Sequence, residues 1–363
     1  MNVLEQLGFA IDRHPSPVAA DVRATLLEDP GFGRVFTDHM AVIRWREGQG
    51  WHDAKVTPRK AFEIDPACAV LHYAQEIFEG MKAYRTGNGV TLFRPEENAR
   101  RFRESARRMA MPELPEELFL RAVDELVKID AGWVPGGDGS LYLRPFMFAS
   151  EAFLGVRPSA EYVFAVIACP VGAYFKGGKK AVTVWVSDDY TRAAPGGTGA
   201  AKCGGNYAAS LIAQAQASEH GCDQVVFLDA AEHRWVEELG GMNIFFLFDD
   251  GALLTPPLGG TILPGITRDA ILTLARERGH GVREERYGFD QWRADAASGR
   301  LREVFACGTA AVITPIGEVK ASAGGFTIGD GEGGAATQAL RNELVGIQRG
   351  TVEDRHGWVR HVI

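Results

Sequence analysis

A single lysine, Lys202, stands among glycines in the stretch RAAPGGTGAAKCGGNY, which covers residues 192–207. Glycine lets the backbone take positive φ values and approach a ligand closely, although it costs about 0.5–1 kcal/mol relative to alanine inside a regular element. The pattern therefore predicts a constrained backbone with something packed close to it. Five glycines flank the lysine: Gly196, Gly197, Gly199, Gly204 and Gly205.

Three kinds of chemistry compete for this lysine, beside a plain surface loop in which its amine is solvated. A nucleotide P-loop needs a serine or threonine directly after the lysine, where Cys203 stands. A dinucleotide site needs a strand, a glycine turn and a helix with an acid downstream, and that order is missing at this point. What remains is a lysine that reacts itself, by forming a Schiff base with an aldehyde.

A Schiff-base lysine implies pyridoxal phosphate, which also needs a phosphate cradle and an acid at its pyridine nitrogen. Residues 264–267 (PGIT) form a glycine turn that enters a helix, so their amides and the helix dipole could bind an anion. The turn at residues 308–310 (GTA) offers amides and a hydroxyl to a phosphate or a carboxylate. Taken singly, both signals are weak, because such turns are common.

The acid that fits the pyridine nitrogen is Glu238, which precedes a glycine pair in the run VEELGGMN. A carboxylate at that nitrogen keeps it protonated, so that the ring can accept electrons from the substrate Cα. A solvated acid at a strand end explains the same pattern, and from the pattern Glu237 would serve equally well.

The elements before residue 170 predict an α+β unit. A hairpin is expected over residues 35–45 and 51–57, and strands over 141–148 and 161–169. Pro95 opens a helix with Glu96 and Glu97 in its first turn, and a second helix covers residues 116–129. On the first helix Arg101 lies at the edge of the apolar stripe and is the arginine best placed to reach inward. Residues before about 33 are expected to be irregular.

After a connector rich in glycine and lysine, the pattern changes to short strands interrupted by helices over about 208–220 and 267–278. The fold class is therefore mixed α/β, or α+β, in two domains. We expect a small N-terminal α+β domain over 1–170, an interdomain loop over 171–180, and a larger C-terminal domain over 181–363. The larger domain is expected to be rich in β-strands, with helices, and to carry Lys202.

Composition excludes several other classes of protein. The chain has 363 residues and a formal charge of −8, which argues against nucleic acid or an anionic membrane as a partner. Its five cysteines are scattered and never form a C-x-x-C pair, so neither a disulfide framework nor a bound metal is expected. The first residues do not resemble a signal peptide, and the apolar runs are short. We expect a cytoplasmic protein.

Eight motifs occur in order over almost the whole chain, and together they resemble the branched-chain amino acid aminotransferases of the fold-type IV pyridoxal-phosphate family. The motifs are FTDHM (Phe36–Met40), LFRPEENARRF, LYLRP, CPVGAYF, KCGGNYAAS, EELGGMN, ILPGITRD and CGTAAVITP. The resemblance implies that architecture and the transamination of leucine, isoleucine and valine with 2-oxoglutarate. Such a reaction is the last step of branched-chain biosynthesis or the first step of degradation.

The resemblance also implies roles for single residues. Lys202 would form the Schiff base, Tyr207 would lie near the 3′-oxygen of the cofactor, and Glu238 rather than Glu237 would meet its pyridine nitrogen. The phosphate would be held by Arg101, Ile266, Thr267 and Thr309. The substrate carboxylate would meet the backbone amides of Thr309 and Ala310, with Gly241 beside them. The side-chain pocket would be lined by Phe32, Tyr73, Phe78, Tyr142 and Tyr174, with Arg144 near the second carboxylate of glutamate.

Family members are dimers, so the resemblance implies a homodimer in which the loop with Leu154 and Val156 reaches the partner's pocket. Mitochondrial-type members carry a redox C-x-x-C where this chain has Ala311 and Thr314, so no thiol switch is expected there. Those members also have a threonine at the position of Gly241, where only the backbone can serve here.

Within the same fold, D-amino acid aminotransferases and aminodeoxychorismate lyases are the nearest alternatives, and LYLRP and GAYF favour the branched-chain activity. A nucleotide-binding protein that uses the lysine loop to hold a phosphate is an alternative from another class. A scaffold without catalysis is the last alternative.

Overall fold

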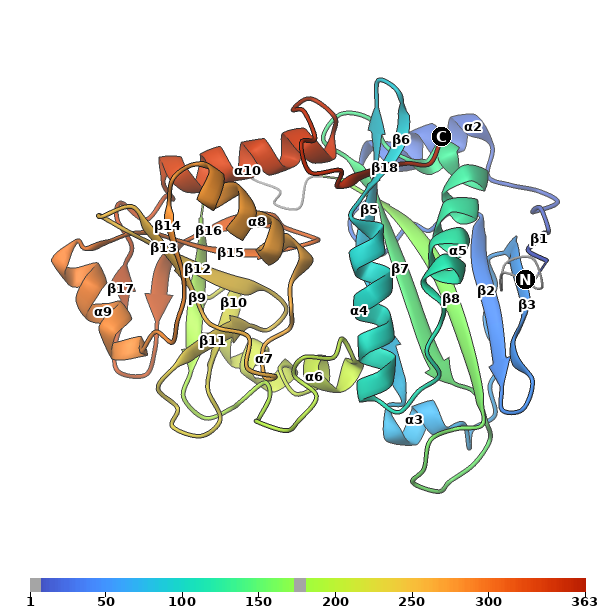
Figure 1. Ribbon diagram of the computed structural model, residues 1–363, viewed down its shortest axis with the longest axis horizontal. Helices are drawn as coiled ribbons and strands as arrows, with labels where there is room; N and C mark the ends of the chain where they lie inside the picture. Colours follow the sequence, from blue (N-terminus) through green and yellow to red (C-terminus); the bar gives the residue numbers. More distant parts are fainter. Residues whose placement is uncertain (1–7, 173–180) are drawn as a thin grey trace. The chain divides into compact units, whose positions relative to one another are not determined.

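The computed structural model describes residues 8–172 and 181–363, which form two compact units with one nine-stranded sheet each (Figure 1). The first unit comprises the described residues up to 172 together with Ala201–Gly204 and Ile347–Ile363. The second unit comprises residues 181–200 and Gly205–Gly346. This division differs from the expected one at two places, because the short segment around Lys202 and the C-terminal segment belong to the first unit. Residues 173–180 of the expected loop lie outside the described residues.

The first unit is built on a sheet with the strand order β1-β3-β2-β8-β7-β5-β6-β18, and β4 pairs with β7 off this path. All neighbours are antiparallel except β1 and β3. The strands are β1 (Ala10–Ile11), β2 (His39–Arg46), β3 (Gly50–Pro58), β4 (Glu76–Phe78), β5 (Met81–Thr86), β6 (Gly89–Phe93), β7 (Ser140–Ala149), β8 (Glu161–Val171) and β18 (Val359–His361). The helices are α2 (Ala20–Glu28), α3 (Ala69–Tyr73), α4 (Pro95–Arg108), α5 (Glu116–Ile129) and the 3-10 turn η1 (Ala131–Trp133).

Helices α4 and α5 lie along one face of this sheet (Figure 1). Pro95 occupies the first turn of α4 with two acids beside it, as its sequence predicts. Phe102 of α4 packs against Phe119 of α5 and Phe164 of β8, with ring centroids 5.4 Å apart in both pairs. This buried aromatic contact fixes the rotation of α4, and with it the direction in which the polar edge of the helix points.

The second unit is built on a mixed sheet with the order β11-β10-β9-β16-β15-β12-β13-β14, and β17 pairs with β16. The pairs β9–β10, β9–β16 and β13–β14 are parallel. The strands are β9 (Val182–Ser187), β10 (Gln224–Leu228), β11 (Val236–Leu239), β12 (Asn243–Phe248), β13 (Ala252–Thr255), β14 (Gly281–Glu284), β15 (Leu301–Gly308), β16 (Val312–Lys320) and β17 (Phe326–Thr327). The remaining helices are α6 (Gly204–Ala208), α7 (Leu211–Glu219), α8 (Ile266–Glu277), α9 (Phe289–Ser298) and α10 (Ala335–Gln348).

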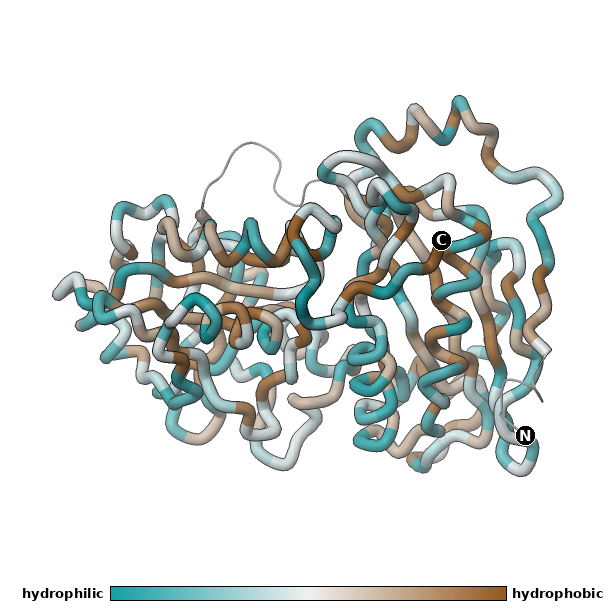
Figure 2. The backbone as a smooth tube through the Cα atoms, turned by 45° about the horizontal axis from the view of Figure 1, so that its top comes forward, coloured by the Kyte–Doolittle hydropathy of each residue, from teal (hydrophilic) through white to brown (hydrophobic). Residues whose placement is uncertain are grey.

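Strand β12 is buried along its whole length, which agrees with the apolar run that follows Asn243. Phe246 on this strand meets Trp292 of α9 edge to face at 5.1 Å, in the core of the unit. Figure 2 shows hydrophobic residues along the strands of both units and hydrophilic residues at many of the turns. Each sheet therefore has its own apolar core.

The mixed α/β class and most central elements agree with the sequence analysis, and α5 has the expected bounds. The helix expected over about 208–220 is present as α7, and the separate short helix α6 precedes it. Two expectations were wrong. Residues 20–28 form α2, which has no buried residue and hence no apolar stripe to reveal it. Helices α9 and α10 were not expected, and glycines at positions 331, 333 and 334 precede α10.

Among the described residues, no helix is long and apolar enough to cross a membrane. The same residues contain no group of three or more His, Cys, Asp or Glu side chains that could hold a metal ion.

Candidate active site

The backbone of Lys202 is held on both sides by the first unit. Its N–H donates to the Ser105 hydroxyl of α4 at 3.0 Å. Its carbonyl accepts a hydrogen bond from the N–H of Phe78 at 2.9 Å. Two residues later, the N–H of Gly204 donates to the Glu76 carboxylate. The lysine segment is therefore fixed along β4. These three hydrogen bonds involve only main-chain atoms of the segment, so the Lys202 side chain can change its conformation without breaking them.

The close neighbour of Gly204 is a carboxylate of the protein itself. A Cβ at this position would lie 2.3 Å from Oε1 of Glu76, so a larger residue would have to displace that side chain. Burial raises the pKa of Glu76, while the Gly204 amide and the charge of Arg144 act in the opposite direction. Gly199, on the other side of the lysine, is also a position where a side chain does not fit. A Cβ there would lie 2.2 Å from the Thr261 carbonyl oxygen.

The Lys202 amine lies over an aromatic ring. Its Nζ is 4.9 Å from the ring centroid of Phe78, within the range of a cation–π contact. The guanidinium carbon of Arg144 lies 4.7 Å from the same centroid. The Arg144 Nη2 donates to the Tyr142 hydroxyl at 3.0 Å, and the Phe32 ring meets the Tyr142 ring edge to face at 5.2 Å. The structure thus brings together five of the expected residues.

Arg101 points inward from α4, as the position at the edge of its stripe predicts, and its side chain is 10% exposed. It forms a bidentate ion pair with Glu79, with Nε to Oε1 at 2.7 Å and Nη2 to Oε2 at 2.8 Å. Glu79 is fully buried. The phosphate-binding candidate therefore already has a protein anion on one edge of its guanidinium group.

Tyr73 lies in a different environment from these residues. Its hydroxyl donates to the carbonyl of Leu154 at 2.7 Å. Leu154 and Val156 are 64% and 87% exposed and lie two positions apart on one loop. Tyr174, the remaining pocket candidate, lies outside the described residues.

The remaining cofactor and substrate candidates belong to the second unit, where Glu238 and Glu237 on β11 have different partners. Glu238 is 1% exposed, and its Oε1 lies 2.7 Å from Nη1 of Arg192 and accepts the N–H of Leu263 at 3.0 Å. Glu237 instead accepts a hydrogen bond from the Thr261 hydroxyl at 2.5 Å. Burial raises the pKa of Glu237 more than this hydrogen bond lowers it. Glu238 is therefore the ion-paired, fully buried acid of the two.

The start of α8 is fixed by Asn243, which is the last residue of the EELGGMN motif. Its Nδ2 donates to the carbonyl of Leu263 at 3.1 Å. Its Oδ1 occupies the space beside Gly265, where a Cβ would lie only 2.0 Å away. The sequence ILPGITRD thus packs on EELGGMN, and α8 begins at Ile266 with Thr267 in its first turn. First-turn amides at this position are suited to an anion.

The turn with Thr309 and Ala310 joins β15 to β16 and ends at Val312, whose φ is +62°. A positive φ is strained for a β-branched residue, and such strain is concentrated at functional sites. A Cβ at Gly308 would lie 3.6 Å from the Gly241 carbonyl oxygen, and a Cβ at Gly241 would lie 3.5 Å from the Tyr207 ring. Gly241, Tyr207 and this turn are therefore neighbours.

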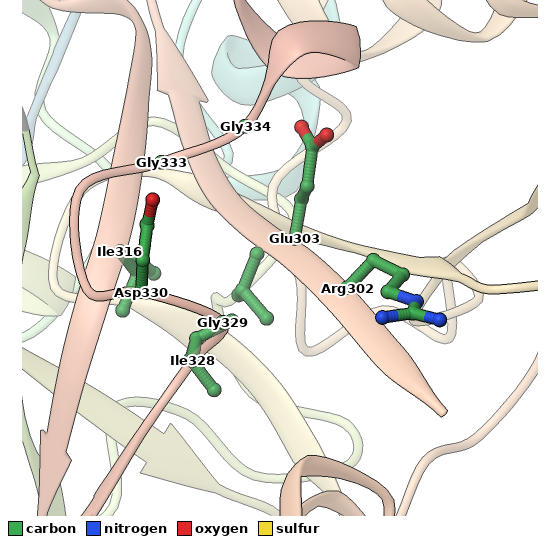
Figure 3. A pocket seen from close by; sticks show the side chains of 9 residues that line it. Arg302, Glu303, Ile316, Ile328, Gly329, Asp330, Gly333 and Gly334 are labelled. Carbon is green, nitrogen blue, oxygen red and sulfur yellow. The ribbon is translucent and has the colours of Figure 1, made fainter. Parts of the chain in front are cut away.

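The second unit also contains a cavity of about 270 Å³ (Figure 3). Glu303 on its wall points toward Gly334 (Figure 3) and accepts the amides of Ala336 and Thr337 at 3.1 and 2.7 Å. This carboxylate therefore satisfies the first turn of α10. The cavity is lined by Arg302, Glu303, Val304, Ile316, Ile328, Gly329, Asp330, Gly333 and Gly334.

The sequence analysis missed four polar residues that position the candidates: Glu79, Ser105 as an anchor of Lys202, Arg192 and Asn243. Arg192 opens the glycine stretch and Asn243 closes the EELGGMN motif, so both were visible as motif residues. Glu79 lies in the run EIFEGMK, where an acid between apolar residues is the available signal.

Comparison with known proteins identifies the family of the chain. The family model described as "Amino-transferase class IV" matches residues 76–319. A branched-chain-amino-acid aminotransferase of Mycolicibacterium smegmatis is 56% identical over 97% of this chain and 98% of that protein. A probable branched-chain-amino-acid aminotransferase of Streptomyces coelicolor is 57% identical over 96% of this chain and 98% of that protein.

Two solved structures share the fold. The branched-chain amino acid aminotransferase from Escherichia coli has a TM-score of 0.72 and 31% identity, over 89% of this chain and 99% of that one. The branched-chain aminotransferase from Thermoproteus uzoniensis, solved with norvaline, has a TM-score of 0.73 and 27% identity, over 89% of this chain and 100% of that one. The chain belongs to the class IV aminotransferases. The resemblance drawn from the motifs is confirmed, and these relatives support the transamination of branched-chain amino acids.

Pyridoxal phosphate is the cofactor of this family, and related structures hold its phosphopyridoxyl or pyridoxamine forms. The residues present have the chemistry that it needs. Lys202 supplies an amine on a fixed backbone, Arg101 supplies a cation of fixed orientation, and Glu238 supplies a buried carboxylate. Lys202 and Arg101 belong to the first unit and Glu238 to the second.

Proposed function

We propose that this chain transfers amino groups between the L-amino acids leucine, isoleucine and valine and 2-oxoglutarate, giving branched 2-oxo acids and L-glutamate. The observation that carries the proposal is the Phe78 ring, which has the Lys202 amine at 4.9 Å and the Arg144 guanidinium at 4.7 Å. One apolar surface thus adjoins both a reactive amine and a cation that suits a carboxylate. An enzyme that accepts both leucine and glutamate needs that combination.

The cofactor would be held by the following side chains. Lys202 would bind its aldehyde, Arg101 its phosphate with Ile266, Thr267 and Thr309, and Tyr207 its 3′-oxygen. Glu238 would meet the ring nitrogen. When bound, pyridoxal phosphate supplies a ring that accepts the electrons left on the substrate Cα. Arg192 and the Leu263 amide both bind Oε1 of Glu238, so the carboxylate that would meet the ring nitrogen is anchored within its own unit.

Lys202 would also move the proton at the substrate Cα. Its backbone is anchored at residues 202 and 204, so only the four side-chain torsions have to change between its two tasks. The centroid of the Phe78 ring lies 4.9 Å from Nζ, so the amine would act as the base beside the apolar part of the pocket.

Substrate selection would depend on the aromatic group with Arg144. Phe32, Phe78 and Tyr142 would contact a branched apolar side chain, whereas Arg144 and the Tyr142 hydroxyl would bind the second carboxylate of glutamate. Tyr73 and Tyr174 would complete the pocket. The α-carboxylate of either substrate would meet the amides of Thr309 and Ala310, with Gly241 beside them.

We further propose a cytoplasmic homodimer in which the loop of Leu154 and Val156 reaches the partner's site. The exposure of these two apolar side chains supports this role, because burial in an interface would remove both from water. Replacing both with glutamate should yield a monomer in light scattering. A double variant that remains dimeric would contradict the placement of the interface.

The function is tested by the variant Lys202→Ala. The purified protein is expected to absorb visible light and to lose that absorption on addition of L-leucine, but not of D-alanine or ATP. Borohydride reduction followed by peptide mass spectrometry should find the cofactor on Lys202. Lys202→Ala should lose both the label and turnover, whereas the control Lys55→Ala, whose amine pairs with Asp53 at the surface, should keep both. Normal turnover by Lys202→Ala would refute the assignment.

A further inference from the structure

Glu79 is the fully buried carboxylate that follows β4, and the catalytic roles proposed above leave it without a task. Its own N–H donates to the carbonyl of Pro145 on β7 at 2.7 Å, so its backbone is fixed to the sheet. The preceding residue, Phe78, contacts Lys202 through its N–H and its ring. Two consecutive residues thus touch the reactive lysine and the phosphate-binding arginine.

The carboxylate of Glu79 is surrounded by donors. Its Oε1 accepts Nε of Arg101 at 2.7 Å. Its Oε2 accepts Nη2 of Arg101 at 2.8 Å, Nδ2 of Asn98 at 2.7 Å and the N–H of Gly80 at 3.1 Å. Asn98 is itself positioned by a second hydrogen bond to the carbonyl of Gly80 at 3.3 Å. Helix α4 therefore contributes both an arginine and an amide to one buried anion.

Glu79 remains charged despite its burial. Burial raises its pKa, but the charge and hydrogen bonds of Arg101, the charge of Lys202 and the hydrogen bond of Asn98 together lower the pKa below its ordinary value. The carboxylate of Glu79 therefore attracts the Lys202 amine, although Arg101 is the main partner of Glu79. A buried carboxylate with this many donors has one stable orientation.

A bidentate contact through Nε and Nη2 fixes the plane of a guanidinium group, because its five donors have a rigid geometry. Glu79 therefore sets the direction in which the whole guanidinium group points. Without this contact, ordering Arg101 against an anion would cost more entropy.

We propose that Glu79 is a positioning residue, which orients Arg101 toward the cofactor phosphate and holds a negative charge near Lys202. It acts through these two residues and touches neither substrate nor cofactor. This inference rests on the proposed function, since it assigns Arg101 and Lys202 the roles given there. If Glu79 served stability alone, it would only have to neutralise the buried charge of Arg101, and the orientation of the guanidinium group would not matter.

The test compares Glu79→Gln with Glu97→Gln, a control on helix α4 whose partly exposed carboxylate pairs with Arg100. Binding of pyridoxal phosphate to the cofactor-free chain is measured by equilibrium dialysis, with inorganic phosphate as a competing probe. Glu79→Gln should weaken cofactor binding by about tenfold or more, and Glu97→Gln should not change it. Binding by Glu79→Gln within twofold of wild type would overturn the inference.

The pH dependence of the visible absorption gives a readout that a purely structural role would not move. Removing a negative charge near Lys202 disfavours the cationic form of its nitrogen, so the pH of the absorption change should fall in Glu79→Gln. An unchanged pH profile would overturn the part of the proposal that concerns Lys202.

A third comparison decides the matter if Glu79→Gln does not fold. The pair Glu79→Gln/Arg101→Gln removes both charges and leaves neither buried alone. If Glu79 acts through Arg101, this double variant binds inorganic phosphate at least as well as Arg101→Gln, and weaker binding by the double variant overturns the inference. Failure of the proposed function is distinguishable, because wild-type protein would then show no borohydride-stable label on Lys202.

Discussion

The ion pair between Arg192 and Glu238 allows a quantitative prediction about the second unit. Both side chains are 2% exposed, and Nη1 of Arg192 lies 2.7 Å from Oε1 of Glu238. The same Nη1 donates to the carbonyl of Thr261 at 3.0 Å. The variant Arg192→Met keeps most of the side-chain volume, but it leaves the carboxylate buried without its cation and removes a donor from the carbonyl.

Removing one partner of a buried pair costs about 3–5 kcal/mol, against about 0–1 kcal/mol for an exposed pair. We therefore expect Arg192→Met to lower the free energy of unfolding by about 3–5 kcal/mol at neutral pH. Glu238→Gln should cost less, because its amide oxygen can still accept from Arg192 and from the Leu263 amide. The double variant Arg192→Met/Glu238→Gln should be more stable than Arg192→Met alone.

Urea denaturation of the cofactor-free chain measures this effect, as a lower midpoint at an unchanged slope. The matched control is Arg283→Met, since Arg283 pairs with Asp250 at 3.4 Å with both side chains about half exposed. A loss below about 1 kcal/mol in Arg192→Met would refute the reasoning, because the pair would then behave as if it were solvated. The reasoning would also be refuted if the double variant Arg192→Met/Glu238→Gln were less stable than both single variants.

Three further predictions concern packing, acid and a helix end. Gly199→Ala should destabilise the fold by about 1–3 kcal/mol in urea, because its Cβ would meet the backbone of Thr261, whereas Gly205→Ala, with open space around it, should be neutral or stabilising. Glu79 has a lowered pKa in the fold, so its contribution to stability is complete above pH 4.5 and is lost as the pH falls through the folded pKa. Acid titrations should therefore be less steep below pH 4.5 in Glu79→Gln than in wild type, and equal slopes would contradict this sign. Glu303→Gln should cost about 0.5–2 kcal/mol, because its oxygens accept two first-turn amides of α10, and hydrogen exchange should show the loss at that helix end.

Local sequence patterns predicted the helices and strands of the candidate site better than they predicted which side chains form ion pairs and hydrogen bonds there. The Pro95 start and the apolar stripe predicted α4, and the position at the edge of that stripe predicted that Arg101 points inward. Helix α2 was missed, because a helix without a buried face has no periodicity to detect. The assignment of Lys202 to the C-terminal domain followed chain order, whereas the contacts of its segment with β4 and α4 join it to the first unit.

The partners of Arg101 and Glu238 could not be predicted, since both pairs join residues from different elements. Arg101 and Glu79 are 22 positions apart, and no periodic pattern relates a strand end to the inner edge of a helix. The close contacts of the glycines with other groups could not be predicted from the sequence either. The sequence shows that Gly204 and Gly199 are glycines, but only the fold shows that a carboxylate lies against one and a carbonyl against the other.

Two arginine–carboxylate pairs are nearly or fully buried in this chain beside candidate cofactor residues, and stability does not account for them. Desolvation of both charges offsets most of their attraction, so apolar side chains of similar volume would stabilise the fold as well or better. What an apolar pair cannot supply is a guanidinium of fixed plane, as in Arg101, or a buried carboxylate held by a cation, as in Glu238. The two pairs should therefore respond differently from ordinary core residues. Neutral double replacements should change unfolding little and cofactor binding much, and the reverse result would mean that the pairs serve the fold alone.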